Sequence, residues 1–108
     1  MTLNEYQKLA MTTLNRDLSE REVLLNSVMG LCGESGEVID CVKKHICHGH
    51  DLNREHLIEE LGDVAWYLAE AAYALGVDLD AVCEGNIAKL KKRYPEGFDK
   101  ERSINREK

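Results

Sequence analysis

Four acidic residues of this chain occur as two pairs with helical spacing. Glu34 and Glu37 are three residues apart in the stretch GESGE, and Glu60 and Asp63 are three apart in EELGD. Residues three apart project from the same face of a helix. Four carboxylates that converge without basic partners would repel each other, and both this repulsion and desolvation would raise their pKa values. A hard divalent cation such as Mg²⁺, which prefers oxygen ligands, would relieve that repulsion. The spacing alone leaves a second interpretation open, in which these acids are ordinary solvated helix faces.

The apolar residues around these acids recur at the spacing of a helix. Ser19 and Glu22 form a capping box, and the apolar stripe that follows predicts a long helix ending near Cys47. Asn53 is a good N-cap for a second long helix, which Gly76 should end. Because the connection between these helices is short, we expect them to pack antiparallel and to bring the two acid pairs together.

Two further helices flank this pair in the sequence. A capping box at Thr2 and Glu5 predicts a helix to about Leu14, and Asp78 and Pro95 should begin and end another. Val and Ile show no strand-like alternation. We therefore predict an all-α fold, a four-helix bundle over residues 1–98, followed by a charged tail over residues 99–108.

Three glycines lie in the first long helix, at Gly30, Gly33 and Gly36. Each glycine in a helix interior costs about 1 kcal/mol relative to alanine. We expect that cost to be offset by the close approach of another helix or of a ligand. The alternative is a break between two shorter helices.

Composition excludes several classes of protein. The chain has 108 residues and a net charge of −6, so it is a poor candidate for binding a nucleic acid polymer. No apolar run approaches the roughly 20 residues of a membrane span, and the N-terminus lacks the apolar centre of a signal peptide, which makes the cytoplasm the expected location. We interpret Cys32, Cys41, Cys47 and Cys83 as small buried hydrophobic residues of a reducing compartment.

Two other metal sites are disfavoured. The residues His45, Cys47, His48 and His50 are of the types that zinc prefers, but their spacing matches no standard zinc motif. A polar loop is the simpler interpretation, in which Lys44 or His48 contacts a phosphate. A di-iron site in a bundle uses Glu-x-x-His, and no Glu of this chain has His three residues later.

Two stretches of the chain resemble a known family. The segments GLCGESGEVIDCVKKHICHG and IEELGDVAWYLAEAAYALGVDLDAVCEGNIAKLKKRYPEGF are similar to the MazG-type all-α nucleoside triphosphate pyrophosphohydrolases, over roughly residues 24–98. The family signature is E-E-x-x-E, a spacer and E-x-x-D. Glu34, Glu37, Glu60 and Asp63 fill four of its five acidic positions, and Gly33 stands at the first.

The resemblance implies an enzyme. Members hydrolyse ribo- or deoxyribonucleoside triphosphates to the monophosphate and pyrophosphate, in roles such as clearing unwanted nucleotides. The resemblance implies Mg²⁺, with Mn²⁺ as a substitute, held by Glu34, Glu37, Glu60 and Asp63. Glu34 or Glu37 would orient the attacking water. It also implies a homodimer or homotetramer whose sites are completed by a neighbouring subunit.

The last predicted helix carries the candidates for substrate binding. Asn86, Lys89 and Arg93 lie at positions i, i+3 and i+7, close to one face. We assign Lys89 and Arg93 to phosphate oxygens and Asn86 to the base or sugar, against the alternative of a solvated basic helix end. Tyr67 lies one turn after Asp63 and would stack on a base, whereas Trp66 is assigned to the core or a subunit interface.

Two alternative functions remain open at this point. A small acidic bundle can be a non-catalytic interaction module, in which case the acid pairs need not converge. The chain can also be a hydrolase of another pyrophosphate, such as a phosphoribosyl nucleotide. Metal binding separates the first alternative from an enzyme, and product analysis separates the second from triphosphate cleavage.

Overall fold

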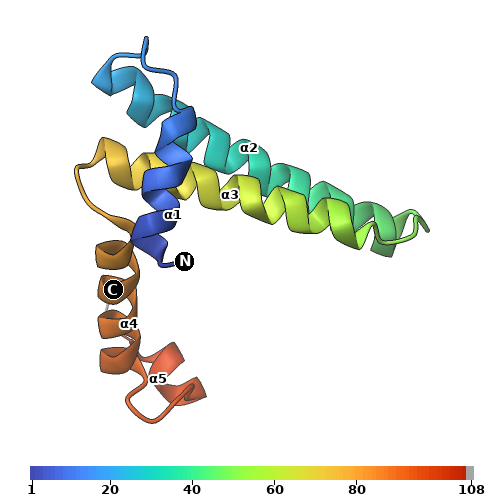
Figure 1. Ribbon diagram of the computed structural model, residues 1–108. Coiled ribbons are helices and arrows are strands. Elements are labelled where there is room, and N and C mark those ends of the chain that lie inside the picture. The colour runs from blue at the N-terminus through green and yellow to red at the C-terminus, as the bar shows by residue number, and fades with distance from the viewer. Residues whose placement is uncertain (107–108) are drawn as a thin grey trace.

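The structure is a computed structural model that describes residues 1–106. Within these residues the chain forms five α-helices (Figure 1). They are α1 (Leu3–Ala10), α2 (Glu20–Cys47), α3 (Arg54–Ala74), α4 (Leu79–Arg93) and α5 (Lys100–Ile104), and a short 3-10 turn, Met11–Thr13, follows α1. The prediction of an all-α fold is confirmed, but five helices are present where four were predicted.

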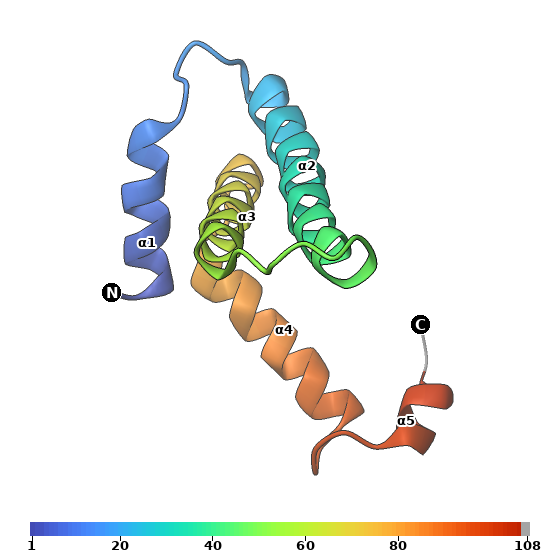
Figure 2. The same ribbon diagram turned by 90° about the vertical axis from the view of Figure 1, so that its right-hand side faces the viewer.

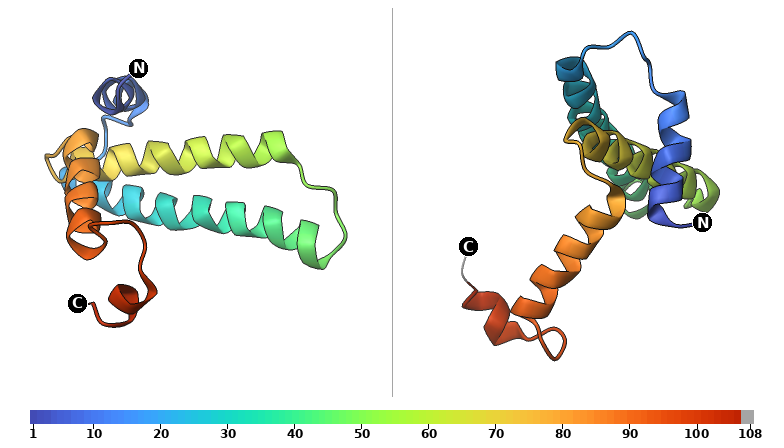
Figure 3. Two further views of the ribbon diagram at one scale, coloured as in Figure 1. Left: turned by 90° about the horizontal axis from the view of Figure 1, so that it is seen from below. Right: turned by 60° about the vertical axis from the view of Figure 1, so that its left-hand side comes forward.

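The two longest helices, α2 and α3, pack side by side as an antiparallel hairpin (Figure 3, left). Both begin at the predicted caps. The Ser19 hydroxyl accepts a hydrogen bond from the Glu22 amide at 3.1 Å, and the Asn53 side chain accepts one from the His56 amide at 3.1 Å. Helix α2 runs unbroken through its three glycines, so the alternative of two shorter helices is wrong.

A buried glutamine ties α1 to the open end of this hairpin. The Gln7 amide nitrogen donates to the carbonyl oxygens of Ala69 and Val77, both at 3.2 Å. Its side-chain oxygen accepts from the Leu79 amide at 3.0 Å, at the first turn of α4. One side chain thus joins α1, the end of α3 and the start of α4.

The buried core lies at the same end. It consists of Ala10, Met11, Leu14, Val23, Ala69, Ala72 and Leu79. Trp66 packs against this core, as predicted, and its indole nitrogen donates to the Ala10 carbonyl at 3.1 Å and to the Thr13 hydroxyl at 2.9 Å.

Much of the apolar stripe predicted for α2 is exposed in the single chain, including Leu24, Leu25, Val28, Ile39 and Ile46. Helix α1 covers only one end of the hairpin (Figure 1), so these side chains are left largely or partly uncovered. The prediction of buried cysteines is wrong as well, because Cys32, Cys41 and Cys47 lie on this same helix and Cys83 lies on α4 (Leu79–Arg93), away from the core. Cys32, Cys47 and Cys83 are exposed and Cys41 is half-buried, and all four are free thiols.

Helix α4 leaves the hairpin and points away from it (Figure 2). The chain then turns at Gly97, whose φ of 95° suits glycine, and forms α5. Helix α5 was not predicted, because the sequence analysis assigned residues 99–108 to a charged tail. Residues 107–108 of that tail lie outside the described part of the chain. None of the helices in residues 1–106 is long and apolar enough to cross a membrane.

Candidate metal centre

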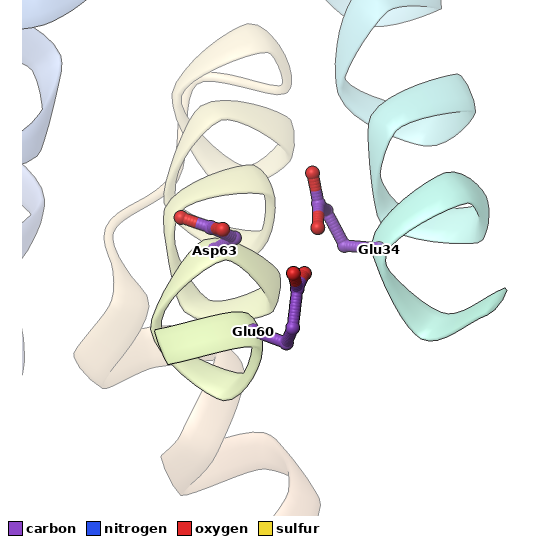
Figure 4. A group of neighbouring side chains, drawn as sticks. All are labelled: Glu34, Glu60 and Asp63. Carbon is purple, nitrogen blue, oxygen red and sulfur yellow. The ribbon is translucent and has the colours of Figure 1, made fainter. Parts of the chain in front are cut away.

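Three carboxylates converge between α2 and α3 (Figure 4). Glu34 comes from α2, and Glu60 and Asp63 come from successive turns of α3. One oxygen from each lies within 4.8 Å of the others. Ligand oxygens around one octahedral ion lie about 3–4 Å apart, given metal–oxygen distances near 2.1 Å. Small side-chain adjustments would therefore bring all three onto one cation.

Glu60 is the most enclosed of the three. Its side chain is 12% exposed, and Oε1 lies 3.3 Å from Nε2 of His56, one turn earlier on α3. Its other oxygen, Oε2, is buried and has no hydrogen-bond partner within residues 1–106. A buried carboxylate oxygen without a donor is costly, because it has lost its water and gained nothing in return. A cation is the partner that this set of hard oxygen donors suits.

The carboxylates also perturb one another. The pKa of Glu34 is raised, chiefly because its protonated carboxyl group can donate a hydrogen bond to the Glu60 carboxylate. Desolvation raises it further, as do the negative charges of Glu60 and Asp63. Without a metal, a proton on Glu34 relieves the repulsion. A divalent cation would take over that role, so the residues present fit such an ion.

Tyr6 is a neighbour of this centre that the sequence does not single out as a site residue. It lies half-buried on α1, and its pKa is raised by burial and by the negative charge of Asp63. The negative charge of Asp63 therefore influences a side chain of α1. Nothing in the spacing of the first helix indicates this, since it depends on how α1 crosses the hairpin.

Glu37, the fourth predicted carboxylate, does not belong to the trio. It is exposed and lines a separate cleft of about 220 Å³ near the connection between α2 and α3, together with Lys44 and His56. Lys44 forms an ion pair with Asp40 at 2.9 Å, which lowers the pKa of Asp40 and raises that of Lys44. The structure therefore brings together three of the four predicted ligands.

Two aromatic side chains, Trp66 and Tyr67, lie beside the acids. Glu34, Asp63, Trp66 and Tyr67 line a cleft of about 350 Å³. The two rings meet edge to face, with their centres 5.1 Å apart and an angle of 84° between their planes. A flat ring of this kind next to carboxylates that could hold a metal is suited to stacking on a nucleobase.

The predicted substrate residues of α4 lie elsewhere in the chain. Lys89 and Arg93 line a cleft of about 650 Å³ between α4 and α5, and Asn86 is exposed on α4. Because α4 points away from the hairpin (Figure 1), this chain does not place them beside its own acids.

A buried carboxylate next to the core was also missed. Glu70 is 0% exposed, and both of its oxygens accept from the side-chain amide of Asn26, at 3.0 and 2.9 Å. Glu70 lies seven residues after Asp63 and therefore close to the same face of α3. That spacing was the available signal for a second acid facing α2.

In this all-α chain the two longest helices bring three carboxylates together, an arrangement like that of helical bundles with metal sites between facing helices. The family model for the MazG nucleotide pyrophosphohydrolase domain matches residues 24–98, and the chain belongs to this family. The resemblance seen in the sequence is thereby confirmed.

One curated protein is also similar to this chain. The Gene 37 protein of Mycobacterium phage L5 is 40% identical over 85 residues, which cover 75% of this chain and 75% of that protein. No solved structure was found to match the chain.

Proposed function

We propose that the protein is a Mg²⁺-dependent nucleoside triphosphate pyrophosphohydrolase. It would cleave ribo- or deoxyribonucleoside triphosphates between the α and β phosphates and release the monophosphate and pyrophosphate. The observation that carries this proposal is the trio of Glu34, Glu60 and Asp63, with its unpartnered oxygen on Glu60, in a chain of the MazG family. An interaction module would have no reason to enclose that oxygen without a donor.

The chain's own residues divide the work as follows. Glu34, Glu60 and Asp63 would hold the cation and so set where the phosphates bind. When bound, Mg²⁺ neutralises phosphate oxygens and makes water more acidic, and Mn²⁺ would substitute for it. Glu37 lies one turn from Glu34 on α2, and one of these two accepts the proton of the attacking water. A bond forms from that water to the α phosphorus, and the bond to the bridging oxygen breaks as pyrophosphate leaves. Tyr67 stacks on the base.

The site also requires cations, which this chain holds at a distance from its acids. We propose that a second copy supplies them, as a homodimer or homotetramer in which α4 of one subunit reaches the acids of the next. Asn86, Lys89 and Arg93 would then bind the nucleotide across the interface. The support is the exposed apolar surface of the hairpin, which includes Leu24, Leu25, Val28, Met29 and Ile39.

The test is pyrophosphate release from a panel of ribo- and deoxyribonucleoside triphosphates, standard and damaged, with Mg²⁺, Mn²⁺ or EDTA. Glu60→Gln removes the most enclosed ligand, and its neighbour Glu59, which is exposed and outside the trio, provides the matched control Glu59→Gln. We expect metal-dependent release that Glu60→Gln abolishes and Glu59→Gln retains. A preference for a damaged base would indicate a role in clearing nucleotide pools.

Two other results would replace the proposal. If no triphosphate is cleaved and Mg²⁺ leaves the thermal stability unchanged, the chain is an interaction module. If Mg²⁺ stabilises the protein through Glu60 but no triphosphate is cleaved, the substrate is another pyrophosphate, such as a phosphoribosyl nucleotide.

A further inference from the structure

The cleft between α4 and α5 concentrates positive charge in an acidic protein. Five cationic side chains line it: Lys89, Lys92 and Arg93 from α4, and Arg102 and Arg106 from the C-terminal segment. Among residues 1–106, Glu101 is the one carboxylate in its lining, and Asn105 adds an amide. The chain as a whole carries a net charge of −6. The cleft is therefore positively charged, although the chain as a whole is negatively charged.

These cations have no ion-pair partner within the part of the chain that the structure describes. Like charges held near one another repel and destabilise the fold, and a bound anion relieves that cost. Lysine offers compact positive charge, and the arginine fork matches two phosphate oxygens at once. The chemistry of the lining thus favours a phosphate ligand.

The turn between the two helices fixes the shape of the cleft. Tyr94 packs against Phe98 with ring centres 5.5 Å apart, and the Gly97 amide donates to the Tyr94 carbonyl at 3.1 Å. The Asp99 side chain then caps α5 by accepting from the Arg102 amide at 3.1 Å. Figure 2 shows α5 lying beyond the end of α4, turned back toward it. The arginines are thus held opposite α4 by local contacts.

The size of the cleft argues for a small ligand. Its volume is about 650 Å³, and sites for small molecules usually measure about 300–1,000 Å³. A run of two or three phosphates fits such a space and would meet cations from both walls.

We infer that α4 and the C-terminal segment together form a binding site for a chain of two or three phosphates. The segment lies beyond residues 24–98, so Arg102 and Arg106 are additions to the part of the chain that the family model matches. The identity of the ligand, as the substrate's triphosphate or the released pyrophosphate, rests on the proposed function. The site itself rests on the charges and shape of the cleft.

The test measures binding of inorganic tripolyphosphate and of pyrophosphate to the full chain by calorimetry, at low salt and in EDTA. Arg102→Gln with Arg106→Gln removes two charges from the cleft. Lys8→Gln with Arg21→Gln removes two exposed charges outside it and is the matched control. We expect the cleft variant to weaken binding about tenfold or more, and the control to weaken it less than about twofold. Lys92→Gln, on the regular helix α4, should weaken binding in the same direction. Circular dichroism checks that each variant is folded.

The result also separates the two sources of the ligand. Tighter binding of tripolyphosphate indicates the substrate's phosphate chain, and equal or tighter binding of pyrophosphate indicates the product. Equal losses in the cleft variant and the control would overturn the inference, as would an unchanged affinity in the cleft variant. It would also be overturned if a single-stranded oligonucleotide bound more tightly than tripolyphosphate and lost its affinity in the same variant, since the cleft would then serve a polymer.

Because no metal and no turnover enter this test, its outcome is independent of the proposed reaction. Binding of tripolyphosphate through the cleft, without pyrophosphate release from any nucleotide, would keep the site and remove the proposed function. If the cleft variant releases pyrophosphate in a metal-dependent way like the wild type and binds the anions with unchanged affinity, the proposed function would stand and the proposed site would be contradicted.

Discussion

The ring of Tyr67 on α3 occupies the space that a side chain at Gly30 of α2 would need. A Cβ built at Gly30 would overlap the ring, whereas one built at Gly33 or Gly36 meets nothing within 4 Å inside the chain. Gly30 is thus the glycine that permits close approach of the two helices, and it sets Tyr67 beside the acids. The other two glycines are open to whatever approaches the outside of α2.

This contrast predicts opposite effects of two equal substitutions. Gly30→Ala should destabilise the protein by about 1–3 kcal/mol, because the ring or the helix must move. Gly33→Ala should stabilise it by up to about 1 kcal/mol, because alanine is the better helix former and finds open space. Urea unfolding followed by circular dichroism measures both. Equal effects of the two variants would contradict the assigned packing.

The raised pKa of Glu34 predicts how the metal-free protein responds to pH. The folded chain holds the Glu34 proton more strongly than the unfolded chain does. Its contribution to stability is therefore complete below the ordinary carboxyl pKa of about 4.5 and is lost as the pH rises through the raised pKa. In EDTA, Glu34→Gln should melt at a higher temperature than the wild type at neutral pH, and the gap should close in acid. Adding Mg²⁺ at neutral pH should stabilise the wild type more than the variant. A variant that melts below the wild type in EDTA at neutral pH would contradict the repulsion argued for the trio.

The buried pair of Asn26 and Glu70 predicts a strongly coupled double mutant. Asn26→Leu leaves the Glu70 carboxylate at 0% exposure without its donor, and should cost about 2–4 kcal/mol. Replacing both residues by leucine should cost much less, because no buried polar group is left unpaired. A double-mutant cycle by urea unfolding isolates the coupling. If the free energy of unfolding lost by the double variant equals the sum of the losses of the two single variants, the two side chains are independent. The hydrogen bonds from Asn26 are then not what stabilises Glu70.

The parts of the fold that depend on neighbouring residues could be read from the sequence. Thr2, Ser19, Asn53 and Asp78 all cap helices in the structure, because a cap bonds to an amide three residues further on. The short helix α5 was missed, since four polar residues and one isoleucine carry no apolar stripe. An apolar stripe shows which face of a helix tends to be buried, but it does not show what packs against that face. For this reason the prediction that the cysteines are buried was wrong.

The candidate site shows the same limit. Spacing placed Glu34 with Glu37 and Glu60 with Asp63 on shared faces, yet the structure groups Glu34 with the α3 pair and leaves Glu37 apart. Spacing within one helix does not set the register between two helices, which decides which turns face each other. Glu70 was missed because a glutamate is usually exposed, and only the packing of α2 on α3 buries this one.

The hydrogen bonds of Gln7 predict a variant that separates the two proposed sites. Gln7→Met keeps the size of the side chain but leaves the carbonyls of Ala69 and Val77 and the amide of Leu79 without their partner. We expect a loss of about 2–4 kcal/mol in urea unfolding, and Lys8→Gln, an exposed neighbour, should lose almost nothing.

Because Gln7 holds the start of α4, the Gln7→Met variant should also reduce pyrophosphate release, which needs α4 to be correctly placed relative to a hairpin. Tripolyphosphate binding should persist while the protein is folded, since the contacts of Tyr94, Gly97 and Asp99 that shape the cleft are local to α4 and α5. If the folded variant loses both pyrophosphate release and tripolyphosphate binding, the cleft depends on the hairpin. If it retains both, Gln7 does not set the direction of α4.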